Sequence, residues 1–211
     1  MLERVELFIN LKKKEIAALE SFSEPLDVAQ NTVVINEGER TDSLFVIIKG
    51  RAYAYCTDNA GRQLIVNRFG PFDYFGEMSF FDGKKRSASV ATKEDCRLLV
   101  IPRQQFMEFT TTHPQIYWNV SKALIEKLRK ATQQIEELAF VDVYSRLTRF
   151  LTENQDDNGV LSEKFTQQEL ADIVGATRET ICRIFNDLAS AGYLVKQGNR
   201  LVIVKPLPYK L

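Results

Sequence analysis

The sequence contains few of the residues that build metal centres or disulfide networks. It has three cysteines and one histidine among 211 residues. Cys56, Cys96 and Cys182 lie far apart and are odd in number, which excludes a disulfide framework or a paired-cysteine metal site and favours a reducing cytosol. Because His113 stands alone, the sequence also argues against a metal enzyme with clustered histidine ligands.

Net charge and long apolar runs are lacking as well. The 28 lysines and arginines balance 28 aspartates and glutamates, so the chain cannot hold nucleic acid or a membrane by bulk positive charge. Apolar runs are as short as residues 44–48, and residues 1–10 contain no continuous apolar segment. We therefore expect neither a signal peptide nor a membrane span, and a soluble cytoplasmic protein with no membrane partner.

Residues 1–112 read as one domain made largely of short strands. Between about residues 26 and 103, β-branched and aromatic residues recur in short runs separated by Gly and Asn turns, such as the turn at 58–61. This pattern predicts an antiparallel sandwich or small barrel. In the first twenty residues the loose period of Leu7, Leu11, Ile16 and Leu19 predicts a helix.

The period changes at His113-Pro114, and residues 113–138 read as one long helix. Pro suits the first helical position, and no Gly or Pro follows until Leu138. Charged residues, Lys127 among them, occupy the other faces of a narrow apolar stripe. The stripe consists of Val120, Leu124, Leu128, Ala131, Ile135 and Leu138. Such a narrow stripe favours pairing of two copies of the helix, and the alternative is a helix that covers the β domain.

Residues 139–211 read as a second small domain. Helical patterning over residues 143–151 is followed by a capping box at Thr166 and Glu169, which predicts the start of another helix. Gly175 ends that helix and Thr177 caps the next, which runs from Arg178 to about Ser190. Two short helices with this corner, followed by a hairpin whose turn is Gln197-Gly198-Asn199, predict a winged helix-turn-helix.

The second of these helices has two distinct faces. Ile181, Ile184, Phe185 and Leu188 share the apolar one. The opposite face centres on Glu179, Arg183 and Asn186, with Arg178 at the exposed N-terminal end. Arg can bridge the two acceptors of guanine, and a carboxylate can accept from the amino group of cytosine. This face is therefore predicted to read bases in a major groove; the alternative is an ordinary solvated face.

The charge of this domain limits how it can bind. From Ala139 to Leu211 there are nine basic and nine acidic residues. Since affinity for DNA grows with the number of neutralised phosphates, one copy should bind weakly. Tight binding should require two copies that are one major groove apart, as the pairing helix would place them.

One segment of the β domain, residues 75–89, carries a possible ligand site in a loop between two strands. Gly76 lets a ligand approach the backbone, and Glu77 can accept a ribose hydroxyl. Arg86 offers a planar fork to a phosphate, and Ser87 adds a hydroxyl and a backbone N–H. Each residue alone is common in ordinary turns, so only the combination with the other elements indicates a ligand site.

The whole chain resembles the cyclic-AMP receptor/fumarate-nitrate reductase regulator (Crp/Fnr) family of bacterial transcription factors. Gly76, Glu77 and residues 86–88 resemble its phosphate-binding cassette, residues 138–143 its hinge and residues 175–183 its recognition helix. The resemblance implies an α+β fold with an N-terminal antiparallel β-roll of the jelly-roll, cyclic-nucleotide-binding type, a long dimerisation helix and a C-terminal winged helix-turn-helix. It also implies an allosteric regulator rather than an enzyme, with no resident cofactor and with cAMP as effector.

The resemblance assigns roles to individual residues. Gly76, Arg86 and Ser87 would hold the cyclic phosphate, Glu77 the ribose and Thr132 the base from the partner subunit. Thr177, Arg178, Glu179 and Arg183 would contact double-stranded DNA at a palindrome of TGTGA-like half-sites, and RNA polymerase would be a further partner.

Some positions depart from the family pattern. Ala131 and Thr132 stand where the cAMP-binding members carry adjacent Thr and Ser, which keeps open a regulator that senses another ligand or binds DNA without a nucleotide. Gln167 and Gln168 stand where a phosphate-contacting Arg is common. A metal-dependent enzyme of the cupin type, on the same β-roll, would need clustered His or carboxylate ligands that one histidine cannot supply.

Overall fold

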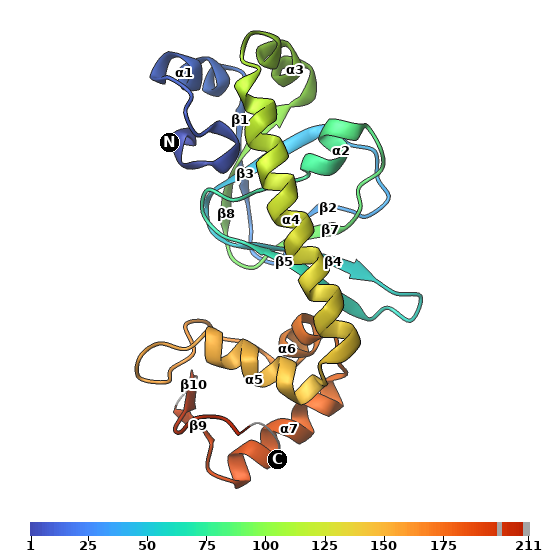
Figure 1. Cartoon of the computed structure of the whole chain (residues 1–211), viewed down its shortest axis with the longest axis vertical. Coiled ribbons are helices and arrows are strands. Elements are labelled where there is room, and N and C mark those ends of the chain that lie inside the picture. The colour runs from blue at the N-terminus through green and yellow to red at the C-terminus, as the bar shows by residue number, and fades with distance from the viewer. Residues whose placement is uncertain (198–199, 209–211) are drawn as a thin grey trace. The chain divides into compact units, whose positions relative to one another are not determined.

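The chain has an α+β architecture with two compact units, seen in a computed structural model that describes residues 1–197 and 200–208 (Figure 1). The N-terminal unit comprises residues 1–57 and 66–130, and the C-terminal unit comprises residues 58–65 and those from 131 onward. Within the described part of the chain, no helix has the length and apolar character needed to cross a bilayer, and no group of three or more potential metal ligands comes together.

Two four-stranded sheets form the centre of the N-terminal unit, which confirms the predicted antiparallel β domain. The first has the order β1-β8-β3-β6 and the second the order β2-β7-β4-β5. The strands of the first sheet are β1 (Glu24–Val28), β3 (Ser43–Lys49), β6 (Tyr74–Phe75) and β8 (Cys96–Pro102). Those of the second are β2 (Val33–Ile35), β4 (Ala52–Thr57), β5 (Gln63–Phe69) and β7 (Ser89–Thr92). Phe45 and Phe75 stack with their ring centroids 5.1 Å apart in the core between the strands.

The N-terminal segment differs from the single helix that its sequence predicts. Two short 3₁₀ turns, η1 (Leu2–Arg4) and η2 (Glu6–Phe8), precede helix α1 (Lys13–Ser21). Asn10 adopts a left-handed conformation with φ of 74°, which interrupts any continuous helix. Leu2, Val5, Leu7 and Phe8 are completely buried, at a spacing that a helix of 3.6 residues per turn would not place on one face. Core packing therefore outweighs the weak helical period here.

The segment expected to be a loop, residues 75–89, contains a short helix α2 (Glu77–Asp82). Gly76 and Gly83 flank it, and both have left-handed backbone angles with φ of 84° and 70°. A side chain on Gly76 would overlap with Nη1 of Arg86, whereas nothing lies within 4 Å of the corresponding point on Gly83. Gly76 is thus required by crowding as well as by conformation.

Helix α3 (Arg103–Thr112) leads into α4 (Gln115–Phe140), the long helix that the sequence predicts over residues 113–138. Near its start, Ile116, Val120 and Ala123 are buried in the core of the N-terminal unit. Later positions of the predicted stripe are exposed: Leu124 by 41%, Leu128 by 68%, Ile135 by 67% and Leu138 by 46%. The first turns of α4 are therefore apolar because they cover the β domain. The rest of the stripe lies in solvent.

The C-terminal unit is a helix-turn-helix followed by a β-hairpin wing. Its elements are α5 (Val143–Glu153), α6 (Gln167–Val174), α7 (Arg178–Ser190), β9 (Leu194–Gln197) and β10 (Arg200–Ile203). The capping box of Thr166 and Glu169, the left-handed Gly175 and the Thr177 cap are all confirmed. The predicted turn at Gly198 and Asn199 lies outside the described residues.

The apolar face of α7 packs into the core of this unit. Ile181, Ile184 and Leu188 are at least 93% buried, and Phe185 is partly buried against the same cluster. The structure therefore leaves the polar face of α7 for solvent or a partner.

We expect Gly76→Ala to destabilise the protein by more than Gly83→Ala. Both changes place a side chain at a left-handed angle, which costs about 1–2 kcal/mol. Only Gly76→Ala also displaces a buried charged hydrogen bond, adding about 1.5–3 kcal/mol. Denaturant unfolding of the two variants checks the difference, and equal losses of stability would contradict the crowding at Gly76.

Candidate functional site

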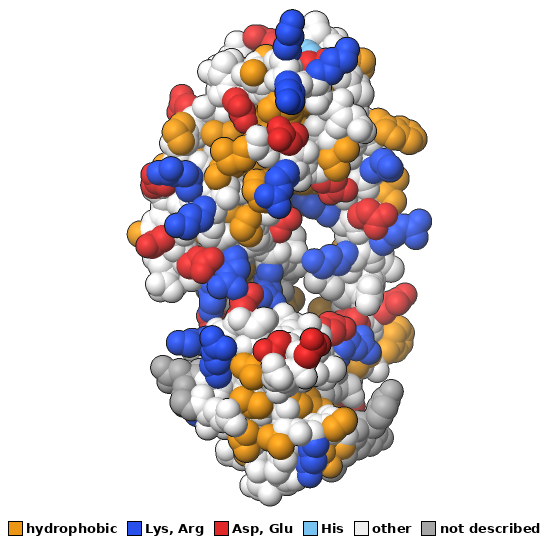
Figure 2. Space-filling view, turned by 90° about the vertical axis from the view of Figure 1, so that its left-hand side faces the viewer, with side chains coloured by type: hydrophobic (Ala, Val, Ile, Leu, Met, Phe, Trp, Pro, Cys, Tyr) orange, Lys and Arg blue, Asp and Glu red, His pale blue; other side chains and the backbone are white. Residues whose placement is uncertain are grey.

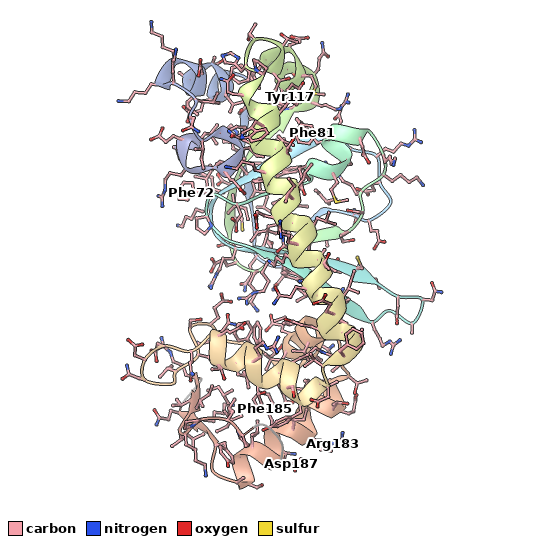
Figure 3. The ribbon with its side chains drawn as sticks, in the orientation of Figure 1. Phe72, Phe81, Tyr117, Arg183, Phe185 and Asp187 are labelled. Carbon is pink, nitrogen blue, oxygen red and sulfur yellow. The ribbon has the colours of Figure 1, made fainter. Side chains whose placement is uncertain are left out.

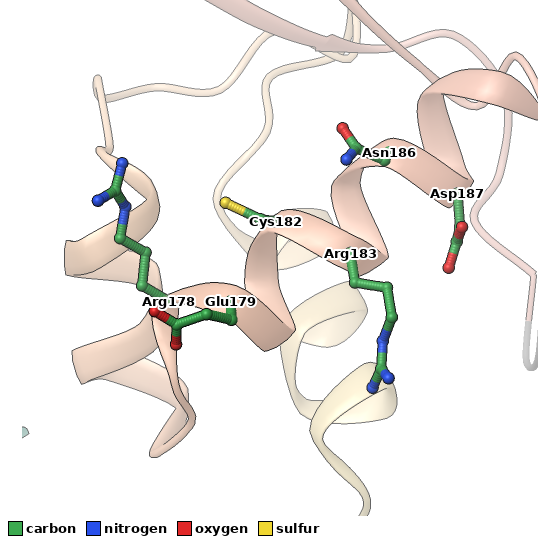
Figure 4. A pocket seen from close by; sticks show the side chains of 6 residues that line it. All are labelled: Arg178, Glu179, Cys182, Arg183, Asn186 and Asp187. Carbon is green, nitrogen blue, oxygen red and sulfur yellow. The ribbon is translucent and has the colours of Figure 1, made fainter.

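Helix α7 presents a polar outer face. Arg178, Glu179, Arg183 and Asn186 are all exposed, and together with Cys182 and Asp187 they line a shallow hollow on the surface (Figures 3 and 4). The N-cap Thr177 holds the first turn by accepting a hydrogen bond from the backbone of Thr180 at 3.2 Å. The predicted DNA-contacting residues thus lie at the N-cap and in the first two turns of one helix: Thr177, Arg178, Glu179 and Arg183.

Glu179 remains a hydrogen-bond acceptor over a wide pH range. Its own backbone N–H and the Thr177 hydroxyl hold the pKa of the Glu179 carboxyl below its usual value, with a smaller contribution from Arg178. The positive end of the helix acts in the same direction. The Glu179 carboxylate can accept a hydrogen bond from a base, while the neighbouring arginines can donate to other bases. This combination suits the major groove, where base-pair edges carry both donors and acceptors.

A contact between α6 and α7 was missed by the sequence analysis. The half-buried Cys182 donates its thiol proton to Oε1 of Gln167 at 2.7 Å. The two residues come from different helices, so their spacing in the chain gives no signal of this pairing. Gln167 therefore has a defined partner on the surface beside the reading residues.

In the N-terminal unit, Arg86 organises the predicted ligand segment. Its side chain is buried and donates to Thr41 Oγ1 at 2.6 Å, to the Gly76 carbonyl at 2.6 Å and to the Ser43 carbonyl at 2.7 Å. Burial lowers the pKa of the Arg86 guanidinium, and the nearby carboxylate of Glu77 opposes that shift. Arg86 thereby joins the start of α2 to the start of β3.

Glu77 lies beside this cluster in the first turn of α2. Glu77 as a whole residue is 8% exposed, and its carboxylate accepts from Nζ of Lys127 at 2.8 Å. Lys127 also lies over the ring of Tyr74, 4.2 Å from the ring centroid. Burial and the charge of Glu77 raise the pKa of Tyr74, so its hydroxyl stays protonated. The sequence places Lys127 on a face beside the apolar stripe and gives no signal of this contact, because its partner is fifty residues away in the chain.

The other predicted ligand residues are positioned differently. Ser87 is exposed, and its hydroxyl donates to the sulfur of Met78 at 3.5 Å. Thr132 is exposed on α4 and belongs to the C-terminal unit. The structure therefore brings Gly76, Glu77 and Arg86 together, with Ser87 adjacent to Arg86 in the chain.

Charge is mixed on one face of the molecule. On the face seen in Figure 2, basic and acidic side chains are interspersed, and the two kinds are equal in number in the whole chain. With a net charge of zero, the chain as a whole offers no broad positive field to a polyanion.

Two parts of the chain match known protein families. Residues 25–113 match the family described as cyclic nucleotide-binding domain, and residues 145–207 match the Crp-like helix-turn-helix domain. The first match covers both sheets and the Arg86 cluster, and the second covers α6, α7 and the wing.

Similar proteins and structures cover most of the chain. A "CRP-like cAMP-activated global transcriptional regulator" of Mycobacterium tuberculosis is 30% identical over 96% of this chain and 94% of its own. The "cAMP-activated global transcriptional regulator Vfr" of Pseudomonas aeruginosa is 30% identical over 82% of this chain and 85% of its own.

Two solved structures show the same fold. The c-di-GMP-responsive regulator CLP of Xanthomonas campestris is 24% identical with a TM-score of 0.82, over 92% of this chain and 100% of its own. The catabolite activator protein of Thermus thermophilus is 25% identical with a TM-score of 0.59, over 94% and 93%. One chain thus contains a cyclic nucleotide-binding domain and a Crp-like helix-turn-helix domain, and it is 30% identical to the mycobacterial regulator over 96% of its length. The protein therefore belongs to the Crp/Fnr family of DNA-binding transcription regulators.

Proposed function

We propose that this regulator acts as a homodimer that is switched by a cyclic nucleotide, cAMP, bound in its β domain. The observation that carries the proposal is the assembly of Gly76, Glu77 and Arg86 around one point in the β domain. Two relatives that are 30% identical are named as cAMP-activated. The effector would act inside the cell, and the regulated partner would be promoter DNA with RNA polymerase.

The contacts of Arg86 suggest how a cyclic phosphate is held. Its three hydrogen bonds to Thr41, Ser43 and Gly76 leave further N–H groups of the guanidinium for a phosphate oxygen. Because the side chain is already fixed, little conformational entropy is lost when the ligand binds. Ser87 would add its hydroxyl, and Thr132 of the partner subunit would reach the base.

Glu77 provides a link from ligand to helix α4. A ribose hydroxyl that donates to Glu77 competes with Lys127 for the same carboxylate. Lys127 belongs to α4, so a change in this ion pair reaches the helix that we propose to form the dimer. Ligand would shift the population toward the DNA-binding arrangement in proportion to its preference for that state.

The exposed part of α4 supports the proposed dimer. Leu124, Leu128, Ala131, Ile135 and Leu138 form an exposed continuation of the stripe that Val120 begins. Trp118 and Ile125, exposed by 69% and 50%, are further exposed apolar residues of the same helix. An apolar surface of this length marks an interface, and its narrow repeat is that of a helix paired with another helix.

DNA reading would use the outer face of α7. Arg178, Glu179 and Arg183, with Thr177 at the cap, would read TGTGA-like half-sites of a palindrome. The equal numbers of basic and acidic residues from Ala139 to Leu211 make a second copy necessary for tight binding.

A second candidate function is a regulator of the same fold that responds to another ligand or to none. Ala131 stands where the cAMP-binding members carry a hydroxyl-bearing residue, and it has no hydroxyl of its own. Arg86 also donates hydrogen bonds to three acceptors within the protein, so its presence in the sequence can be explained by structure without any nucleotide.

Calorimetry with cAMP separates these two candidates. We expect heat of binding for the wild-type protein, and about a fivefold weaker Kd for Ser87→Ala because one hydrogen bond is lost. Ser190→Ala, an exposed change in α7, serves as the control. No heat with cAMP, or heat with cyclic di-GMP alone, would reject cAMP as effector.

Arg183→Ala should weaken binding to a TGTGA-containing palindrome by about 1–3 kcal/mol and relax the preference at one base pair, because the guanine-reading fork is lost. Mobility shifts with every single-base variant of the half-site measure this. Lys196→Ala, on the exposed wing strand β9, is the control and should change all sites alike. A uniform loss for Arg183→Ala would assign that residue to phosphate rather than to a base.

The double change Leu124→Glu and Ile135→Glu should convert the dimer into a monomer, because four like charges would face one another in an apolar seam. Sedimentation velocity reports the mass directly. Glu126→Lys, on the exposed side of the same helix, should leave the dimer intact. A double variant that still sediments as a dimer would place the interface elsewhere.

A further inference from the structure

Arg146, in α5, holds together two helix ends that are distant in the chain. Its Nη1 donates to the carbonyls of Val141 at 2.5 Å and Glu137 at 3.3 Å, at the end of α4. Its Nε donates to the Val174 carbonyl at 2.9 Å, and Nη2 lies 3.5 Å from that of Gly175. All of these residues belong to the C-terminal unit.

These carbonyls need a donor from outside their own helices. The last carbonyls of an α-helix have no partner within it and carry partial negative charge. Glu137 is in the last turn of α4, Val174 is the last residue of α6, and Gly175 is its C-cap. A single planar guanidinium can serve both groups at once, whereas an ammonium group has no such fork.

Two further contacts attach the same turn of α4 to the same region. A side chain built on Gly175 would lie 3.1 Å from Cδ2 of Leu138, so Leu138 packs directly over the corner of the helix-turn-helix. Arg149, one turn after Arg146, forms an ion pair with Glu137 at 2.8 Å. The end of α4 and the corner between α6 and α7 are therefore connected through α5.

We infer that Arg146 is a positioning residue that fixes the orientation of the reading helix relative to the end of α4. This inference rests on the proposed dimer, in which α4 pairs with its copy and α7 enters the DNA. Arg146 contributes no DNA contact of its own. Its effect is on geometry, because the separation of the two reading helices depends on how firmly each domain is attached to the paired helices.

This role predicts an effect that differs from that of a DNA-contacting residue. Loss of Arg183 weakens binding to a single half-site and to paired half-sites alike, because its own base contact is lost. Loss of Arg146 leaves each half-site contact unchanged and removes the advantage of having two half-sites at the correct separation, about one turn of DNA. Spacing preference is thus the specific readout of positioning.

The test uses the full-length protein and three DNA duplexes: one half-site, two half-sites one helical turn apart, and two half-sites with two base pairs inserted. We expect Arg146→Ala to lose about tenfold in affinity for the correctly spaced duplex. Its affinity for the single half-site should stay within about twofold of wild type, so the preference for correct spacing is largely lost.

Two variants control the interpretation. Thr152→Ala removes only a hydrogen bond within α5, to the Thr148 carbonyl, and should leave all three affinities within about twofold of wild type. Arg146→Lys keeps the charge and can serve one helix end, so it should show a partial loss of spacing preference. Because Arg146→Lys retains a donor at this position, it also tests the inference if Arg146→Ala fails to fold, which circular dichroism reports.

The outcomes are distinct. If Arg146→Ala loses the same factor in affinity on the single and the paired half-sites, Arg146 only maintains the fold of the domain. If Arg146→Lys keeps the full preference for correct spacing, the guanidinium fork is not needed. Either result overturns the inference. A wild-type protein without any spacing preference would overturn the proposed dimer, and this inference with it.

Discussion

Helix α4 must satisfy two environments with one apolar stripe, and the functional organisation of the protein depends on this constraint. Ile116, Val120 and Ala123 are covered by the core of the N-terminal unit, while the continuation from Leu124 to Leu138 is exposed. Exposure of so many large apolar side chains in a row costs free energy unless another surface covers them. In the proposed dimer a second copy of the helix would provide that surface, as the narrowness of the stripe favours.

Two arginines show how differently the same side chain can be used. Arg86 is buried among Thr41, Ser43 and Gly76, and Arg146 connects the ends of α4 and α6. Both act mainly on backbone carbonyls, which a sequence motif cannot reveal. Arg86, to which the family resemblance assigns a ligand, is therefore also a structural element, and its replacement would remove three hydrogen bonds within the protein.

Local signals were sufficient for the helix-turn-helix. Its caps and its turn are formed by residues only a few positions apart in the chain. Each forms the cap or turn that its residue type and spacing predict: Thr166, Glu169, Gly175 and Thr177. The strands of the β domain were also predictable from short β-branched runs.

Contacts between distant segments were not predictable in this way. Lys127 meets Glu77 and Cys182 meets Gln167 only because separate elements pack together. At the N-terminus, the complete burial of Leu7 together with Leu2, Val5 and Phe8 accompanies two 3₁₀ turns in place of one helix. At α2 the two left-handed glycines delimit a helix in place of the expected loop. In these places tertiary packing outweighed local propensity.

The balanced charge of the C-terminal domain has a consequence for how the protein searches a chromosome. A strongly basic domain is sequestered by random sequence, since counterion release favours any stretch of duplex. With nine acidic residues for nine basic ones from Ala139 to Leu211, this domain has little hold on such competitor DNA. Selection of a promoter by such a domain depends more on the recognition of its bases than on attraction to the phosphate backbone.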